Sequence, residues 1–200
     1  MEIKGHGRAL LQIVILTVLL GTSPACSSLP RIVILHDPLT AQEHASLGEA
    51  YQAQGDTEGA AREFEEALRR QSEFVPALIG LGNVAFERGA LDDAERWYQR
   101  ALEAAPEDAG AGNNLAMAYT ARNKRLDEAE RLARIALERG ETLRPYALDT
   151  LAKIYIRQGR YLEARTALEM AEAVAPPDNA HFREGLSQSR RELAAVYSPK

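Results

Sequence analysis

Residues 75–108, VPALIGLGNVAFERGALDDAERWYQRALEAAPED, decide the fold of this chain. Leu81-Gly82 lies in a first run of apolar and small residues, Gly89 interrupts that run, and Tyr98 lies in a second run with the same spacing. Apolar residues three and four positions apart share one face of an α-helix, and a glycine between two such runs is typical of a turn. The stretch therefore predicts two short helices that pack closely through small side chains.

The same pattern occurs four times along the chain, at a spacing near 34 residues. The four copies occupy residues 41–74, 75–108, 109–144 and 145–178. Each copy opens with a leucine followed by a small residue: Leu47-Gly48, Leu81-Gly82, Leu115-Ala116 and Leu151-Ala152. Two alanines seven residues apart follow in each copy: Ala60 and Ala67, Ala94 and Ala101, Ala129 and Ala136, Ala164 and Ala171. Repeats of this length indicate stacked units that bury their apolar faces against their neighbours.

The pattern resembles the tetratricopeptide repeat (TPR), a helix–turn–helix unit of 34 residues. Besides the leucines, small residues and alanines above, the resemblance rests on aromatic residues and prolines at signature positions: Tyr51, Phe64, Tyr98, Pro106, Tyr119, Tyr155 and Pro176. It covers residues 41–178 and implies an all-α, right-handed solenoid whose first helices line a concave groove. Thr40 with Glu43 predicts a capping box at the start of the first helix.

Two parts of the chain depart from the regular repeat. The third copy has one extra residue in its inner turn, at Asn123–Arg125, and another near residues 140–143, and both are expected in loops. Residues 179–200 lack a second half-repeat, but Phe182, Leu186 and Leu193 mark one apolar face. This segment predicts a ninth helix that caps the stack, followed by a short tail.

The resemblance also places a set of side chains on or near the groove. They are Asn83, Phe86, Asn113, Asn114, Met117, Tyr146, Asp149, Lys153 and Ile156, with Glu49 and Arg183 close by. An asparagine amide both donates and accepts, so it can pair with the backbone of an extended peptide of any sequence. Apolar side chains between such contacts can form pockets for a partner's side chains. The alternative is that each of these residues is merely solvated or packs against the adjacent repeat.

Several classes of function are disfavoured by the sequence. With 24 basic and 29 acidic residues, the chain lacks the basic surface that binds nucleic acid. It contains no nucleophile elbow, phosphate loop or metal-binding helix, and its four histidines are scattered. Ala45, Ile79 and Asp149 occupy the repeat position where clamps for acidic peptide tails carry a cation. We therefore expect a non-enzyme with no metal, cofactor or small-molecule substrate. Glu130 and Arg134 are expected to form a solvated pair within one helix.

Residues 1–25 are typical of an export signal, with Lys4 and Arg8 before an apolar run of about a dozen residues. Cys26, the single cysteine, follows small residues, so the junction resembles a bacterial lipobox and indicates lipidation at Cys26. Ser23 and Pro24 depart from that motif. Cleavage by ordinary signal peptidase, giving a secreted or periplasmic protein with a free thiol, stays open, and so does an uncleaved anchor.

Residues 26–40 form a spacer that contains the apolar run 32–35. This run either packs on the first helix, lies in the groove or docks a partner. Taken together, the sequence predicts an interaction scaffold that binds a peptide or protein, tethered by lipid to the bacterial envelope and facing the periplasm from the outer membrane. Pilus, secretion or envelope assembly is the expected setting. The alternatives are a regulatory subunit of a secreted peptidase or cell-wall enzyme, and a module that self-assembles through Phe182 and Leu186.

Overall fold

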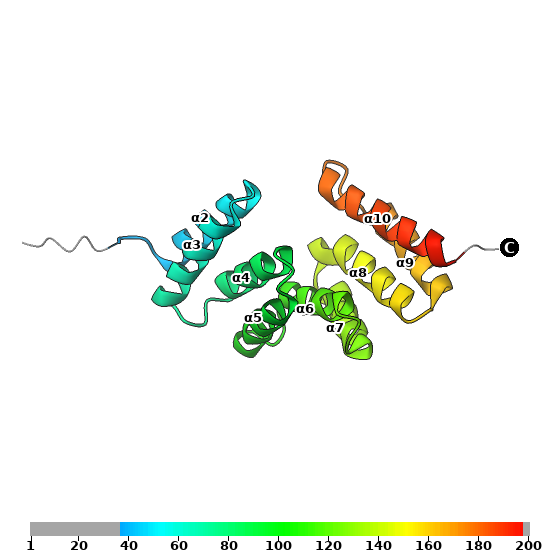
Figure 1. Ribbon diagram of the computed structural model, residues 1–200, viewed down its shortest axis with the longest axis horizontal. Coiled ribbons are helices and arrows are strands. Elements are labelled where there is room, and N and C mark those ends of the chain that lie inside the picture. Colours follow the sequence, from blue (N-terminus) through cyan, green and yellow to red (C-terminus); the bar gives the residue numbers. More distant parts are fainter. Residues whose placement is uncertain (1–36, 198–200) are drawn as a thin grey trace, which may run out of the picture. The chain divides into compact units, whose positions relative to one another are not determined.

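The computed structural model describes residues 37–197, and these residues form nine α-helices and one short 3₁₀ helix without a strand (Figure 1). The helices are α2 (Ala41–Ala53), α3 (Thr57–Arg70), α4 (Val75–Glu87), α5 (Leu91–Ala104), α6 (Ala109–Ala121), α7 (Leu126–Arg139), α8 (Arg144–Arg157), α9 (Tyr161–Ala173) and α10 (Ala180–Val196), with η1 (Glu141–Leu143) before α8. The predicted all-α class and the predicted helix pairs are confirmed.

The helices form two layers. Each repeat contributes an antiparallel pair, and the first helices α2, α4, α6 and α8 contact one another in succession to form the inner layer. The second helices form the outer layer: α3, α5 and α7 each contact the first helices on either side of them, and α9 contacts α8 and α10 (Figure 1). Every repeat thus buries its apolar face against the next repeat, as expected for a stack of this kind.

Small residues on the inner helices let aromatic rings of the outer helices approach closely. A Cβ atom added to Gly48 would lie 2.7 Å from Cε1 of Phe64, and one added to Gly80 would lie 2.6 Å from Cε2 of the same ring. The ring of Phe64 is fully buried between these two glycines, which belong to successive repeats. Gly82 receives the ring of Tyr98 in the same way. Glycine at these sites is required by the close approach of a ring.

Left-handed residues make the turns within the pairs. Gly55, Gly89 and Gly159 have φ values of 80°, 73° and 74°. Asn123 takes the same place in the third repeat with φ 51°, as its tolerance of this conformation predicts. The extra residue lengthens this turn to four residues, and Arg125 at its end is also left-handed. At the start of the first helix, the Thr40–Glu43 capping box is present in both directions.

The second extra residue of the third repeat is not simply absorbed in a loop, as the sequence led us to expect. The link from α7 to α8 has four residues, as do the links from α3 to α4 and from α5 to α6. Three of the four form η1, and α8 starts at Arg144 and has 14 residues where α2, α4 and α6 have 13. The additional residue therefore extends the first turn of α8.

Helix α10 packs against α8 and α9 and closes the C-terminal end of the stack, as predicted. Phe182 and Leu186 are buried in this contact. The rings of Phe182 and of Tyr146 on α8 pack in a T-shaped arrangement with ring centroids 4.9 Å apart. Because both side chains are already covered, self-assembly through Phe182 and Leu186 is not available to this conformation.

Candidate functional site

The inner layer carries a pocket of about 210 Å³ where four helices meet. Phe86 comes from α4, Met117 from α6 and Lys153 from α8, so the structure brings together three of the predicted groove residues. The other lining residues are Thr120, Ala121, Thr150, Arg157 and Glu192. The pocket offers an apolar wall from Phe86 and Met117 together with charges of both signs.

Two of the predicted asparagines bind each other across the boundary between the second and third repeats. The side-chain carbonyl of Asn83 accepts from the hydroxyl of Tyr98 at 2.9 Å and from the amide of Asn114 at 3.0 Å. Burial raises the pKa of the Tyr98 hydroxyl, so this group stays protonated and donates. The carbonyl of Asn83 is thus committed to internal contacts, while its role toward a peptide stays a prediction.

Asn113 on α6 is the unusual polar residue of the inner face. Its side chain is 3% exposed, and its amide nitrogen lies 3.8 Å from the sulfur of Met117, which lines the pocket. Its carbonyl oxygen has no hydrogen-bond partner among the residues that the structure describes. Burying an acceptor without a donor costs about 1–3 kcal/mol, and such groups are rare in native proteins. Asn113 is therefore the residue of this face that most lacks a partner.

The predicted groove residues at the start of α8 are covered by α10. Asp149 accepts a 2.6 Å hydrogen bond from the hydroxyl of the fully buried Ser189 and forms an ion pair with Lys153 at 2.7 Å. Tyr146 accepts from the side-chain amide of Asn179, just before α10, at 2.8 Å. The capping helix thus occupies this end of the inner face, so Tyr146 and Asp149 hold α10 in place.

The remaining predicted residues differ in exposure. Ile156 is half-buried and packs against the main core, whereas Glu49 and Arg183 are exposed.

Thr120 and Thr150 also line the pocket, although the sequence did not lead us to predict them. Their repeat positions are those of Phe86 and Asn114, so the register was a sufficient signal for both. Glu192 lies on α10, which follows no repeat register, so no such signal existed for it.

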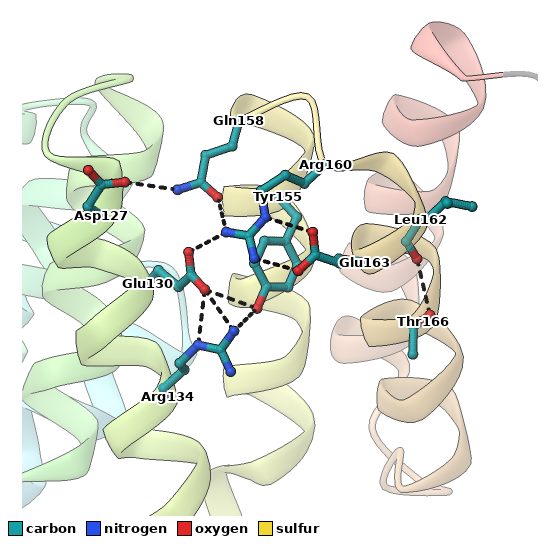
Figure 2. A network of polar contacts seen from close by, with 9 residues as sticks. All are labelled: Asp127, Glu130, Arg134, Tyr155, Gln158, Arg160, Leu162, Glu163 and Thr166. Atoms are coloured by element: carbon teal, nitrogen blue, oxygen red, sulfur yellow. Dashed lines mark hydrogen bonds and ion pairs between the residues drawn. The ribbon is translucent and has the colours of Figure 1, made fainter.

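A polar cluster on the outer side joins the third repeat to the fourth (Figure 2). Glu130 on α7 accepts from Arg134 at 2.8 Å, from Arg160 at 2.5 Å and from the hydroxyl of Tyr155 at 3.3 Å. The guanidinium of Arg160 also lies over the ring of Tyr155, 4.3 Å from its centroid. Glu163 completes the cluster by binding Arg160 at 2.7 Å.

This cluster corrects the expectation of a solvated Glu130–Arg134 pair. The Glu130 carboxyl is only 15% exposed and is bound by two repeats at once. Burial raises the pKa of this carboxyl, but the hydrogen bonds from Arg160 and Arg134 outweigh burial, and the pKa lies below its ordinary value. Glu130 is therefore ionised at neutral pH and links α7 to the turn before α9.

An equivalent cluster joins the second repeat to the third. There Glu95 binds Arg122, and the Arg125 guanidinium lies 4.8 Å from the ring centroid of Tyr119. Between the first and second repeats, the corresponding glutamate and tyrosine positions hold Ala61 and Ala85. The first boundary therefore lacks this form of cross-repeat support.

Comparison of the sequence with models of known protein families identifies the family of this helical stack. The sequence model described as the MalT-like TPR region matches residues 37–196, which is most of the chain and the whole helical stack. The chain belongs to this family. TPR stacks are scaffolds for protein–protein interaction. The resemblance to the TPR family that we inferred from the repeat signature is confirmed. Comparison with curated protein sequences gave no match.

Solved structures share the TPR fold at low sequence identity. The APC/C hetero-tetramer Cut9–Hcn1 has a chain that is 20% identical, with a TM-score of 0.64 over 76% of this chain. The Pseudomonas aeruginosa pilF structure is 21% identical, covers 80% of this chain and 74% of its own, and has a TM-score of 0.58. The MamA structure is 18% identical, and the match covers 75% of this chain and 94% of the MamA chain with a TM-score of 0.55. This chain spans 30% of the matched chain in the Cut9–Hcn1 structure, and these likenesses show the fold alone.

Some predictions fall on residues without a structural description. Cys26, the leader and the apolar run 32–35 lie outside the described residues 37–197. Within that described part, no helix combines the length and the apolar character needed to cross a membrane. No three His, Cys, Asp or Glu side chains converge there as ligands for a metal ion.

Proposed function

We propose that this chain is a non-catalytic scaffold that holds an extended segment of a partner protein along its inner layer. The observation that carries the proposal is the pocket shared by α4, α6, α8 and α10, one of whose lining residues, Met117, contacts the buried Asn113 with its unpartnered carbonyl oxygen. Because this oxygen is buried, a backbone N–H of the bound segment would satisfy it only after Met117 moves aside. Met117, which contacts Asn113 and lines the pocket, has an unbranched side chain that repacks readily around a ligand.

The charges around the pocket support a polar backbone as the ligand. Lys153 and Arg157 supply cations at this site, and Glu192 supplies an anion. Lys153 is already paired with Asp149, so the pocket carries little net charge. A surface of this kind suits the alternating donors and acceptors of a peptide, with Phe86 and Met117 contacting its apolar side chains.

Photocrosslinking tests the inner-layer assignment. We would place p-benzoylphenylalanine at Phe86 or at Met117 in the full chain, and at the exposed Glu65 on α3 as the control. Both inner positions are expected to capture the same partner segment in cells, identified by mass spectrometry, and Glu65 is expected to capture none of it. Equal capture at Glu65, or no common segment at the two inner positions, would remove the inner layer as the binding face.

The cellular setting is a second part of the proposal. The leader and the lipobox-like junction support a lipid attached to Cys26, which would hold the scaffold on the outer membrane of a bacterial envelope, facing the periplasm. Pilus, secretion or envelope assembly is the proposed role there. Intact-mass measurement of the mature wild type against Cys26→Ser tests the anchor. The wild type should carry the extra mass of acyl chains, and masses that differ only by the substituted atom would point to a soluble protein.

A further inference from the structure

The chain fills one of its outer grooves with its own tryptophan. Trp97 lies on α5 at position 23 of the second repeat. Its ring packs against the core clusters that contain Leu78 and Leu81, on the side of α4 that faces the outer layer. The Arg100 guanidinium lies over this ring, 4.8 Å from the ring centroid. Trp97 thus covers the boundary between the first two repeats.

The next two repeats carry smaller residues at this position. Allowing for the extra turn residue, position 23 is Leu132 in the third repeat and Ala167 in the fourth. Pockets of about 380 Å³ and 370 Å³ lie in the corresponding places, between α5 and α7 and between α7 and α9. Leu148 and Leu151 line the α7–α9 groove at the repeat positions of Leu78 and Leu81. One groove is therefore filled from within, and its two counterparts are open.

The α7–α9 groove is the more apolar of the two open grooves. Leu137 joins the two leucines of α8 on its floor, and Leu162 and Met170 of α9 stand at its mouth with 60% and 43% exposure. The α5–α7 groove is bordered instead by charged side chains: Glu103, Glu107, Asp108, Arg125, Glu128 and Arg131. Large apolar side chains exposed around a pocket commonly mark a binding site.

We propose that the α7–α9 groove binds the side chain of a tryptophan, or of a similar aromatic residue, presented by a protein partner. The occupant is inferred from the chain itself, because an indole already fills the equivalent space at the first boundary. An apolar cavity of about 150 Å³ is enough to hold benzene, so 370 Å³ accommodates an indole. Aromatic anchors seated in apolar pockets supply much of the affinity at protein interfaces.

The polar cluster of Figure 2 forms one end of this groove. Arg134, Tyr155 and Glu163 belong both to the cluster and to the groove lining. Their hydrogen bonds hold α7, α8 and α9 together, so the groove is largely formed before a ligand arrives. Arg134 also brings a cation near the bound ring, as Arg100 does for Trp97. This site lies in the outer layer and is separate from the inner-layer pocket proposed above.

The test uses N-acetyl-5-fluorotryptophanamide as the probe and the full chain, followed by ¹⁹F NMR. We expect saturable binding to the wild type and at least about tenfold weaker binding to Leu162→Glu, because a carboxylate is desolvated at the groove mouth. Leu162 is mostly exposed, so this variant should fold normally. Lys153→Ala, on the inner layer, should bind the probe as the wild type does.

A second variant fills the groove covalently. Ala167→Trp places an indole at the position that Trp97 occupies in the second repeat and should abolish probe binding. If that variant does not fold, Met170→Glu at the groove mouth takes its place and should also weaken binding about tenfold. Absence of saturable binding to the wild type, or wild-type affinity in Leu162→Glu, would overturn the proposal. Loss of binding in Lys153→Ala would move the site to the inner layer and overturn it as well.

Discussion

Replacing Gly82 with alanine tests the close packing that holds each helix pair together. The added Cβ atom would lie 2.6 Å from Cδ1 of Tyr98, whereas carbon atoms in contact prefer about 3.5–4.0 Å. The Tyr98 ring would therefore have to move by about 1 Å in a fully packed interior. That movement also strains the 2.9 Å hydrogen bond from the Tyr98 hydroxyl to Asn83, which in turn binds Asn114 of the next repeat.

Three contributions set the size of the effect. Overpacking a core site costs about 1–3 kcal/mol, and a weakened hydrogen bond costs about 1 kcal/mol. Alanine favours the helix over glycine by about 1 kcal/mol, which offsets part of this loss. We therefore expect Gly82→Ala to lower the free energy of unfolding by about 1–3 kcal/mol.

Gly185→Ala in α10 is the matched control, because nothing lies within 4 Å of the Cβ atom that this change adds. It should raise the free energy of unfolding by about 0.5–1 kcal/mol through helix propensity. Urea unfolding followed by far-UV circular dichroism measures both changes. If Gly82→Ala stabilised the protein as much as Gly185→Ala, the tight contact of Gly82 with Tyr98 would be refuted.

Three further outcomes are expected. Because the pKa of Glu130 is lowered in the folded protein, its stabilising contribution is complete above its ordinary pKa of about 4.3 and is lost as the pH falls through the lowered value. The free-energy difference between wild type and Glu130→Gln, measured by urea unfolding, should therefore shrink from pH 6 toward about pH 3; a constant difference would contradict the ionic link. Ser189→Ala should weaken the docking of α10 by about 1–2 kcal/mol, because it removes a donor from the buried Asp149. Hydrogen exchange of α10 should speed up in Ser189→Ala but not in the exposed-site control Ser187→Ala. Finally, urea unfolding followed by fluorescence of Trp97, the single tryptophan, should show a lower midpoint than far-UV circular dichroism, because the first boundary has alanine at positions 61 and 85. Coincident midpoints would show that the cross-repeat clusters do not set local stability.

The helical stack could be predicted from the sequence because its packing depends on which residue occupies each position within a repeat. Gly48 and Gly82 indicate sites where an aromatic ring of the outer helix approaches closely, and Asn123 substitutes for glycine in a left-handed turn. The same register placed Phe86, Met117 and Lys153 on the inner layer, and the structure gathers them around one pocket. Each of these inferences needs only the position of a residue within its own repeat.

Contacts between segments far apart in the sequence could not be predicted from positions within a repeat. Helix α10 has no repeat positions, so the sequence did not reveal that Ser189 and Asn179 would cover Asp149 and Tyr146. The spacing of Glu130 and Arg134 described one helix and left out Arg160, which comes from the next repeat. Such side chains are assigned partners only when the neighbouring repeat is placed beside them.

The capping helix also has a consequence for the growth of this molecule by duplication. A repeat inserted after residue 108 would meet neighbours of its own kind on both sides. A repeat appended after residue 178 would have to pull Phe182 away from Tyr146 and Ser189 away from Asp149. New units can therefore be gained at internal junctions, while the C-terminal boundary resists elongation.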